Sequence, residues 1–176
     1  MQEVGRDLYR LALVSSHGGN LSIRNRLAMW ITGTGTMLGH LESRHISLAH
    51  AGGEFEGPAP STDTVLHAAV YALGGFKAIV HAHPRHAIAI SDQLDVFEPP
   101  DFEGRLHLER VPVVAPGPTQ TETIAAALQT SRAVVLRDHG AYARGDDLWE
   151  ALHWITALEE SAEIESIRRA TRPRGS

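Results

Sequence analysis

The stretch KAIVHAHPRHA, residues 77–87, predicts the central element of the fold. Its apolar part, residues 77–83, is typical of a buried strand. Pro84 then predicts the start of a short helix, where its missing N–H costs little. His81 and His83 interrupt the apolar run. Because residues i and i+2 of a strand point to the same face, we expect the two imidazoles to project together.

The paired histidines are candidate metal ligands. Two adjacent imidazoles repel each other when both are protonated, and a divalent metal removes this conflict because its ligands are neutral. A third imidazole completes a site that keeps one position open for substrate. His139 is the candidate, since it follows a buried-looking strand in RDHG and Gly140 allows a sharp turn. The pattern alone fits equally well two strand histidines with ordinary hydrogen bonds.

The composition narrows the classes of function. The chain has 176 residues, which favours a single domain over residues 1–176. A net charge of −5 argues against general nucleic-acid binding, which needs a basic surface. The chain has 11 histidines and no cysteine, so a transition-metal site must use imidazole and carboxylate ligands. With no apolar run of roughly 18 residues and no signal-like N-terminus, we expect a soluble cytoplasmic protein without a membrane segment.

The rest of the chain alternates between helical and strand-like segments. Apolar spacing predicts helices over residues 1–15, 121–129 and about 146–168, and another between an N-cap at Ser61 or Thr62 and a stop at Gly74. We expect strands at residues 21–24, 28–32, 46–50 and 111–116, a strand followed by a turn at 132–140, and a turn at 51–57. Strict βαβ alternation is not obvious, so these elements indicate a central mixed or antiparallel sheet with helices on both faces.

Several short motifs follow one another in a recognisable order. They are G-N-L-S at 19–22, I-T-G-T-G at 31–35, P-S-T-D at 60–63 with His67 after it, V-H-A-H-P at 80–84, V-P-V-V-A-P at 111–116, D-H-G at 138–140 and L-E-E-S-A at 158–162. From about residue 5 to about 168 the chain resembles the class II aldolase/adducin family, and within it the bacterial L-fuculose-1-phosphate aldolases. The resemblance implies an α/β fold of three layers, α/β/α, with a mainly antiparallel sheet. It also implies a homotetramer with sites at subunit boundaries.

The resemblance further implies a metal-dependent aldolase with His81, His83 and His139 as ligands. Such an enzyme cleaves a ketose 1-phosphate, here L-fuculose 1-phosphate, into dihydroxyacetone phosphate and L-lactaldehyde through a metal-stabilised enediolate. Zn²⁺ is the expected cofactor, with Mn²⁺, Co²⁺ and Ni²⁺ as alternatives. Lys77, the only lysine, shows no sign of burial, which disfavours a Schiff-base mechanism. The positions that match the family's phosphate-binding residues are Asn20, Thr34, Gly35, Ser61 and Thr62.

Two positions depart from the family pattern. Asp63 stands where related aldolases usually carry Glu as the acid/base at the reacting carbon, and its arm is one methylene shorter. A favourable position in the first turn of a helix is the alternative interpretation of Asp63. The family's tyrosine that donates a proton to the aldehyde has no counterpart in EGRLHLERVP, where His107 stands near its place. Histidine can supply a proton near neutral pH, and it can equally be a surface residue.

The motifs are also compatible with other reactions that occur on the same fold. Sugar-phosphate 4-epimerases use the same metal and retro-aldol chemistry, and decarboxylases of oxo-tetronate phosphates and thio-sugar dehydratases share the fold. The segment T-G-T-M-L-G-H-L, residues 34–41, resembles the decarboxylase type slightly. An adducin-like, non-catalytic interaction module is a different class of function, and it usually lacks the three metal histidines that this chain retains.

Overall fold

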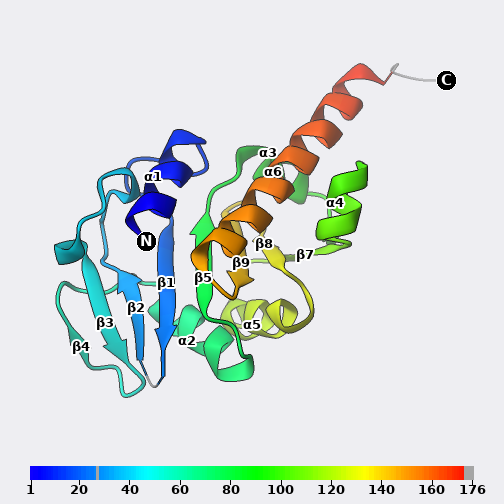
Figure 1. Ribbon diagram of the computed structural model, residues 1–176. Helices are drawn as coiled ribbons and strands as arrows, with labels where there is room; N and C mark the ends of the chain where they lie inside the picture. The colour runs from blue at the N-terminus through cyan, green and yellow to red at the C-terminus, as the bar shows by residue number, and fades with distance from the viewer. Residues whose placement is uncertain (27, 173–176) are drawn as a thin grey trace.

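A computed structural model describes residues 1–26 and 28–172 of the chain. Within these residues the strands form one open sheet in the order β4-β3-β2-β1-β5-β9-β8-β7-β6 (Figure 1). Its strands are β1 (Asn20–Asn25), β2 (Ala28–Thr32), β3 (Ile46–His50), β4 (Phe55–Glu56), β5 (Ala78–Ala82), β6 (Val96–Phe97), β7 (Val111–Val114), β8 (Ala133–Leu136) and β9 (Gly140–Gly145). Neighbouring strands pair antiparallel except for β7 and β8, so the mainly antiparallel sheet is confirmed.

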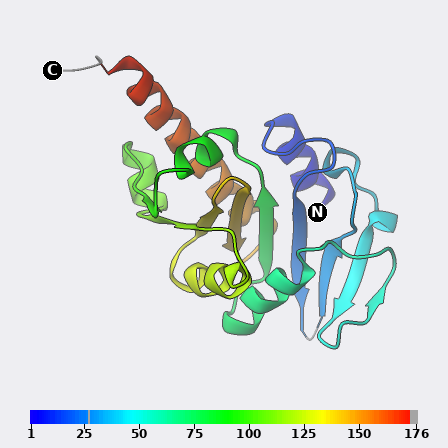
Figure 2. The same ribbon diagram turned by 180° about the vertical axis from the view of Figure 1, so that it is seen from behind.

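Helices cover both faces of the sheet, which confirms the three-layer arrangement. They are α1 (Gln2–Arg10), α2 (Thr64–Leu73), α3 (Arg85–Ser91), α4 (Phe102–His107), α5 (Gln120–Thr130) and α6 (Leu148–Thr171), with two short 3-10 turns at Leu38–His40 and Ser43–His45. In Figure 1, α6 lies in front of the sheet, whereas Figure 2 shows α2 and α5 on the opposite face; α1 and α3 share the hydrophobic core of α6. The long last helix extends past the edge of the sheet (Figure 1).

The central strand divides the hydrophobic core in two. Val80 and Ala82 of β5 pack with Ile155 and other residues of α1, α3 and α6, while Ile79 packs with residues of α2 and α5. All five residues of β5 are buried, as the apolar run predicts. Because strand residues alternate between faces, His81 shares the face of Ile79, beneath α2 and α5.

Three local expectations differ from the structure. The first helix ends at Arg10 instead of reaching residue 15, since Ala12 adopts a φ of +55° and the chain turns back. Val14 is thereby buried, whereas Leu11 is 55% exposed. The predicted turn at 51–57 contains the short edge strand β4. The N-cap of α2 is Asp63, not Ser61 or Thr62, because the helix begins one residue later than expected.

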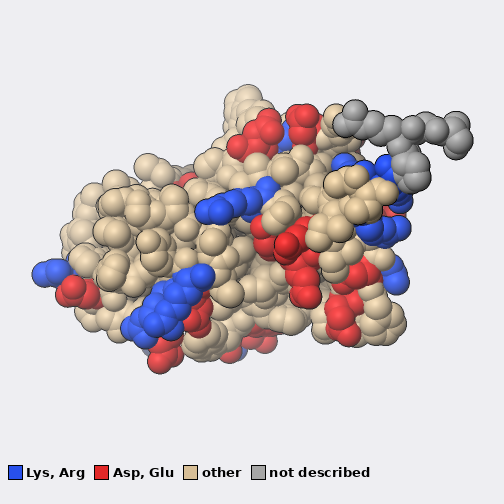
Figure 3. All heavy atoms as spheres, turned by 90° about the horizontal axis from the view of Figure 1, so that it is seen from above, with Lys and Arg blue, Asp and Glu red and all other residues tan. Residues whose placement is uncertain are grey.

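On the face seen in Figure 3, both acidic and basic side chains are present, and much of the left side is uncharged. Among the described residues, no helix combines the length and apolarity needed to cross a lipid bilayer. The prediction of one domain over residues 1–176 includes residues 173–176, which lie outside the described part of the chain.

Candidate metal centre

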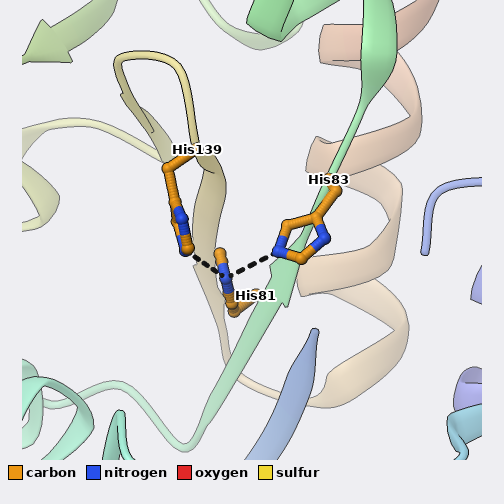
Figure 4. A group of neighbouring side chains, drawn as sticks. All are labelled: His81, His83 and His139. Atoms are coloured by element: carbon orange, nitrogen blue, oxygen red, sulfur yellow. Dashed lines mark hydrogen bonds between the residues drawn. The ribbon is translucent and has the colours of Figure 1, made fainter. Parts of the chain in front are cut away.

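The structure brings the three predicted metal ligands together. His81 lies near the end of β5, His83 directly follows that strand, and His139 lies in the turn between β8 and β9 (Figure 4). The Nε2 atom of His81 is 3.2 Å from Nε2 of His83 and 3.2 Å from Nε2 of His139. One ligand atom from each ring lies within 4.8 Å of the other two. Three imidazole nitrogens therefore converge on one point.

The spacing and protonation of these rings fit a metal ion. Two nitrogens bound tetrahedrally to Zn²⁺ at about 2.0–2.1 Å are separated by about 3.3–3.4 Å, close to the spacing found here. Nδ1 of His81 lies 3.0 Å from the carbonyl oxygen of Ala141 and donates to it, so the lone pair of Nε2 faces the cluster. Burial lowers the pKa of His81 to about 3, and burial and His139 lower the pKa of His83. These two rings are therefore neutral, as metal ligation requires.

Gly140 makes room for the cluster, although it does not make the turn that we expected of it. The positive φ in this turn belongs to Asp138, at +60°, and Gly140 is already the first residue of β9. A Cβ at Gly140 would approach His83 Cδ2 to 2.8 Å and His81 Cε1 to 3.0 Å. The same Cβ would lie 2.5 Å from the backbone oxygen of Ala82, so any side chain at residue 140 would displace the end of β5 together with the imidazoles.

Asp63 lies beside the histidine cluster at the N-terminus of α2. Its Oδ2 is 3.8 Å from Nε2 of His81. The same oxygen accepts hydrogen bonds from Nδ2 of Asn20 at 2.8 Å and from the hydroxyl of Tyr142 at 3.0 Å. Burial raises the pKa of Asp63, but the electrostatic contribution of His81 and these hydrogen bonds outweigh it, so the pKa lies below its usual value. An ionised carboxylate thus faces the place where the histidines converge.

Tyr142 is a residue of the site that sequence analysis missed. Its ring stacks on His81, with 4.1 Å between centroids and 12° between planes. Burial and the charge of Asp63 raise the pKa of its phenol above the usual value, so it donates to Asp63. The sequence signal was the alternation in GAYARG, residues 140–145, which places Tyr142 on the same face as Gly140 of the D-H-G motif.

His67, present in the sequence motif without an assigned role, lies in the buried layer beneath Asp63. It is 0% exposed, and its Nδ1 is 2.7 Å from Oγ of Ser22. Oγ of Ser22 is also 2.7 Å from the hydroxyl of Tyr71. Burial lowers the pKa of His67 to about 4, against the opposing charge of Asp63, so the ring is neutral. Its Nε2 has no partner among the described residues.

The predicted phosphate-binding residues fall into two groups. Gly33 and Pro60 form a bridge that places the loop with Thr34 and Gly35 against the segment with Ser61 and Thr62. The amide of Thr34 donates to the carbonyl of Ala59 at 2.9 Å, and Ser61 Oγ accepts from the amide of Asp63 at 3.2 Å. The backbone N–H groups of Gly35 and Thr62 make no hydrogen bond with the described residues, so both are available to an anion. Asn20 stands apart from this group, because its amide is bonded to Asp63.

Within the chain, His107 lies apart from the cluster of His81, His83 and His139. It is the last residue of α4, and its Nε2 is 3.1 Å from Oε2 of Glu103 in the same helix. Its ring lies 5.1 Å from the ring of His153 and 6.0 Å from that of Trp154, both on α6. The described contacts of the His107 side chain are thus with the helices α4 and α6, away from β5 and α2.

The mixed α/β fold, with its open sheet flanked by helices, matches that of class II aldolase structures. The class II aldolase and adducin N-terminal domain family matches residues 1–166, so the chain belongs to this family.

The relatives in this family catalyse different reactions. The 3-oxo-tetronate 4-phosphate decarboxylase of Haemophilus influenzae is 33% identical, over 93% of this chain and 84% of the relative. The L-fuculose phosphate aldolase of Methanococcus maripaludis is 29% identical, over 91% of this chain and 90% of the relative. The crystal structure of L-fuculose-1-phosphate aldolase from Thermus thermophilus superposes with a TM-score of 0.90, at 36% identity and with 99% and 95% of the two chains covered. The prediction that the protein is an enzyme is confirmed. The relatives differ in substrate, so they do not identify the substrate of this chain.

Proposed function

We propose that the protein is a metal-dependent aldolase that cleaves a ketose 1-phosphate, with L-fuculose 1-phosphate as the first candidate, into dihydroxyacetone phosphate and an aldehyde. The observation that carries the proposal is the convergence of His81, His83 and His139 with the carboxylate of Asp63 beside them. The aldolases of Methanococcus maripaludis and Thermus thermophilus among the relatives support the substrate class.

The three histidines would hold the metal through their Nε2 atoms. When bound, a divalent metal supplies Lewis-acid stabilisation of the negative charge left on the three-carbon half after C–C cleavage. Zn²⁺ suits three imidazoles with an open position, and Mn²⁺, Co²⁺ or Ni²⁺ is an alternative. Lys77 is exposed and precedes β5, at the opposite end of the strand from His81 and His83, which leaves no support for a Schiff base.

Asp63 would move the proton at the carbon next to the carbonyl of the three-carbon half. Its carboxylate is ionised and stands 3.8 Å from His81, so it is placed beside the metal position in a state that accepts a proton. The phosphate would be bound by the loop with Thr34 and Gly35 and by Ser61 and Thr62, where free N–H groups precede the first turn of α2.

A second candidate is decarboxylation of a 3-oxo-tetronate 4-phosphate, and the missing tyrosine favours it. Loss of CO₂ from such a substrate also leaves dihydroxyacetone phosphate, so the metal, Asp63 and the phosphate loop would serve both reactions. Aldol cleavage needs an additional group to transfer a proton at the aldehyde oxygen, whereas CO₂ leaves without one. His107 would have to reach the site from a neighbouring subunit of the homotetramer to fill that role. The 33% identical decarboxylase of Haemophilus influenzae adds support.

The test is release of dihydroxyacetone phosphate by the metal-loaded protein from a panel of ketose 1-phosphates and from a 3-oxo-tetronate 4-phosphate. We expect release from at least one ketose 1-phosphate, and none after removal of the metal with a chelator. Release only from the oxo-tetronate phosphate would replace the aldolase by the decarboxylase. Conversion of a ketose phosphate into its C4 epimer without release would indicate the related 4-epimerase, and no turnover at all would indicate the adducin-like module.

A further inference from the structure

Three side chains form a row across neighbouring strands beneath Asp63. Asn20 of β1 is paired with His81 of β5, and His81 is paired with Tyr142 of β9. Directly opposed residues of antiparallel strands point to the same face of the sheet. Asn20, His81 and Tyr142 therefore stand side by side on the face that carries α2, whose N-cap is Asp63.

The two outer members of the row bind the same carboxylate oxygen. Nδ2 of Asn20 donates to Oδ2 of Asp63 at 2.8 Å, and the hydroxyl of Tyr142 donates to it at 3.0 Å. The other oxygen, Oδ1, accepts no hydrogen bond from the described residues, and the Asp63 side chain is 23% exposed. The hydrogen bonds thus distinguish the two oxygens: one is anchored to the sheet, and the other is available.

The donor of the second hydrogen bond is itself fixed. Tyr142 is 1% exposed, and its ring lies flat against His81. Both rings belong to paired strands at the centre of the sheet, so neither can turn without disturbing the core. A rigid donor fixes the direction of the bond that it makes, which a mobile surface side chain would not do.

We infer that Tyr142 is a positioning residue: its hydroxyl, together with Asn20, fixes the orientation of the Asp63 carboxylate beside the metal position and leaves Oδ1 without a protein partner, available to accept a proton. The inference rests on the proposed function, in which Asp63 moves a proton of the bound three-carbon half. Tyr142 does not touch the substrate in this scheme, and it acts only through the carboxylate. Its contribution should therefore be to the rate of turnover, with little effect on substrate binding or on the metal.

The experiment compares Tyr142→Phe with Tyr71→Phe in the metal-loaded protein. Tyr71 is a matched control, because its hydroxyl is also buried and bonded, at 2.7 Å, but to Ser22 and not to Asp63. We expect Tyr142→Phe to lower kcat by about 10–100-fold, with KM changed by less than about twofold and metal content unchanged. Tyr71→Phe should keep both kcat and KM. A kcat of Tyr142→Phe within about twofold of wild type, or an equal loss in Tyr71→Phe, would overturn the inference.

A second measurement separates this inference from the proposed function. In a crystal structure of metal-free Tyr142→Phe, the carboxylate of Asp63 should turn away from its present orientation, because only Asn20 still anchors Oδ2. An unmoved carboxylate would contradict a positioning role even if the enzyme were active. If the wild type turns over no sugar phosphate, the proposed function fails, and the orientation of Asp63 in this variant still decides what Tyr142 does.

Discussion

The imidazole rings of His81 and His139 lie parallel, with 5.1 Å between centroids and 6° between planes, although 58 positions separate them in the sequence. The antiparallel pairing of β5 and β9 produces this proximity, because His139 directly precedes the residue that opens β9. The Nε2 atoms of the two rings lie 3.2 Å apart in the candidate metal centre.

Replacing His139 with Gln should remove the metal. Two imidazoles remain, and the third nitrogen of the ligand set is lost, so affinity for Zn²⁺ should fall by at least roughly 100-fold, with loss of dihydroxyacetone phosphate release. Metal analysis after dialysis and a competition titration measure the affinity. His40→Gln, at an exposed position, is the control and should bind one metal per chain as the wild type does. Full metal retention in His139→Gln would exclude this ligand.

Gly140→Ala should weaken metal binding without touching a ligand. The added Cβ would lie 2.5 Å from the backbone oxygen of Ala82, 2.8 Å from His83 Cδ2 and 3.0 Å from His81 Cε1, so the end of β5 and both rings must shift from their present positions. We expect a loss of about 10–100-fold in metal affinity. The control is Gly52→Ala, where an added Cβ meets nothing within 4 Å. Equal affinities in the two variants would show that the site tolerates the displacement.

Most of the sheet could be predicted from the sequence because its strands are short apolar runs bounded by turn residues. The strands at 28–32 and 46–50 agree with β2 and β3 residue for residue. β9 was missed because GAYARG follows directly on the D-H-G turn and mixes Gly, Ala and Arg with a single large apolar residue. Its strand character comes from pairing with β5 and β8 on both sides, which a local pattern does not contain.

The candidate metal centre could be predicted only in part, because some of its contacts depend on strand pairing that the sequence does not show. His81 and His83 lie two positions apart, near the end of β5 and directly after it, and the D-H-G motif supplied the third histidine. Tyr142 and Asn20 reach Asp63 through the register of three strands, and register is set by tertiary pairing. Asn20 was consequently predicted to bind phosphate, whereas its amide donates to Asp63 here. That phosphate role stays a prediction.

Asp63→Ala should abolish turnover while the metal stays bound. The carboxylate is the group that moves the proton, so kcat should fall by roughly 10²–10⁴-fold, whereas the three imidazoles remain intact. Steady-state kinetics and metal content are measured on the same preparation. Asp63→Asn keeps the size of the side chain and an acceptor for Tyr142 but not the basicity, and it should be equally impaired. Full activity in either variant would exclude Asp63 as the group that moves the proton.

Acidification should destabilise the metal-free protein, because His67 and His81 are buried as neutral rings. The pKa of His67 is about 4 and that of His81 about 3 in the folded state, against 6.5 in the unfolded chain. Between these values the unfolded chain binds protons that the folded protein does not, so stability falls as pH drops below about 6.5 and is level above it. Each histidine should contribute on the order of 2 kcal/mol between pH 7 and pH 5.

Urea unfolding of the metal-free protein at a series of pH values measures this dependence. His67→Gln removes one of these groups without touching a metal ligand, and it should reduce the fall in the free energy of unfolding between pH 7 and pH 5 by about 2 kcal/mol. His40→Gln should keep the full dependence, since His40 is exposed. A free energy of unfolding that stays constant from pH 7 to pH 5 would mean that both rings accept protons in the folded protein, contrary to their burial.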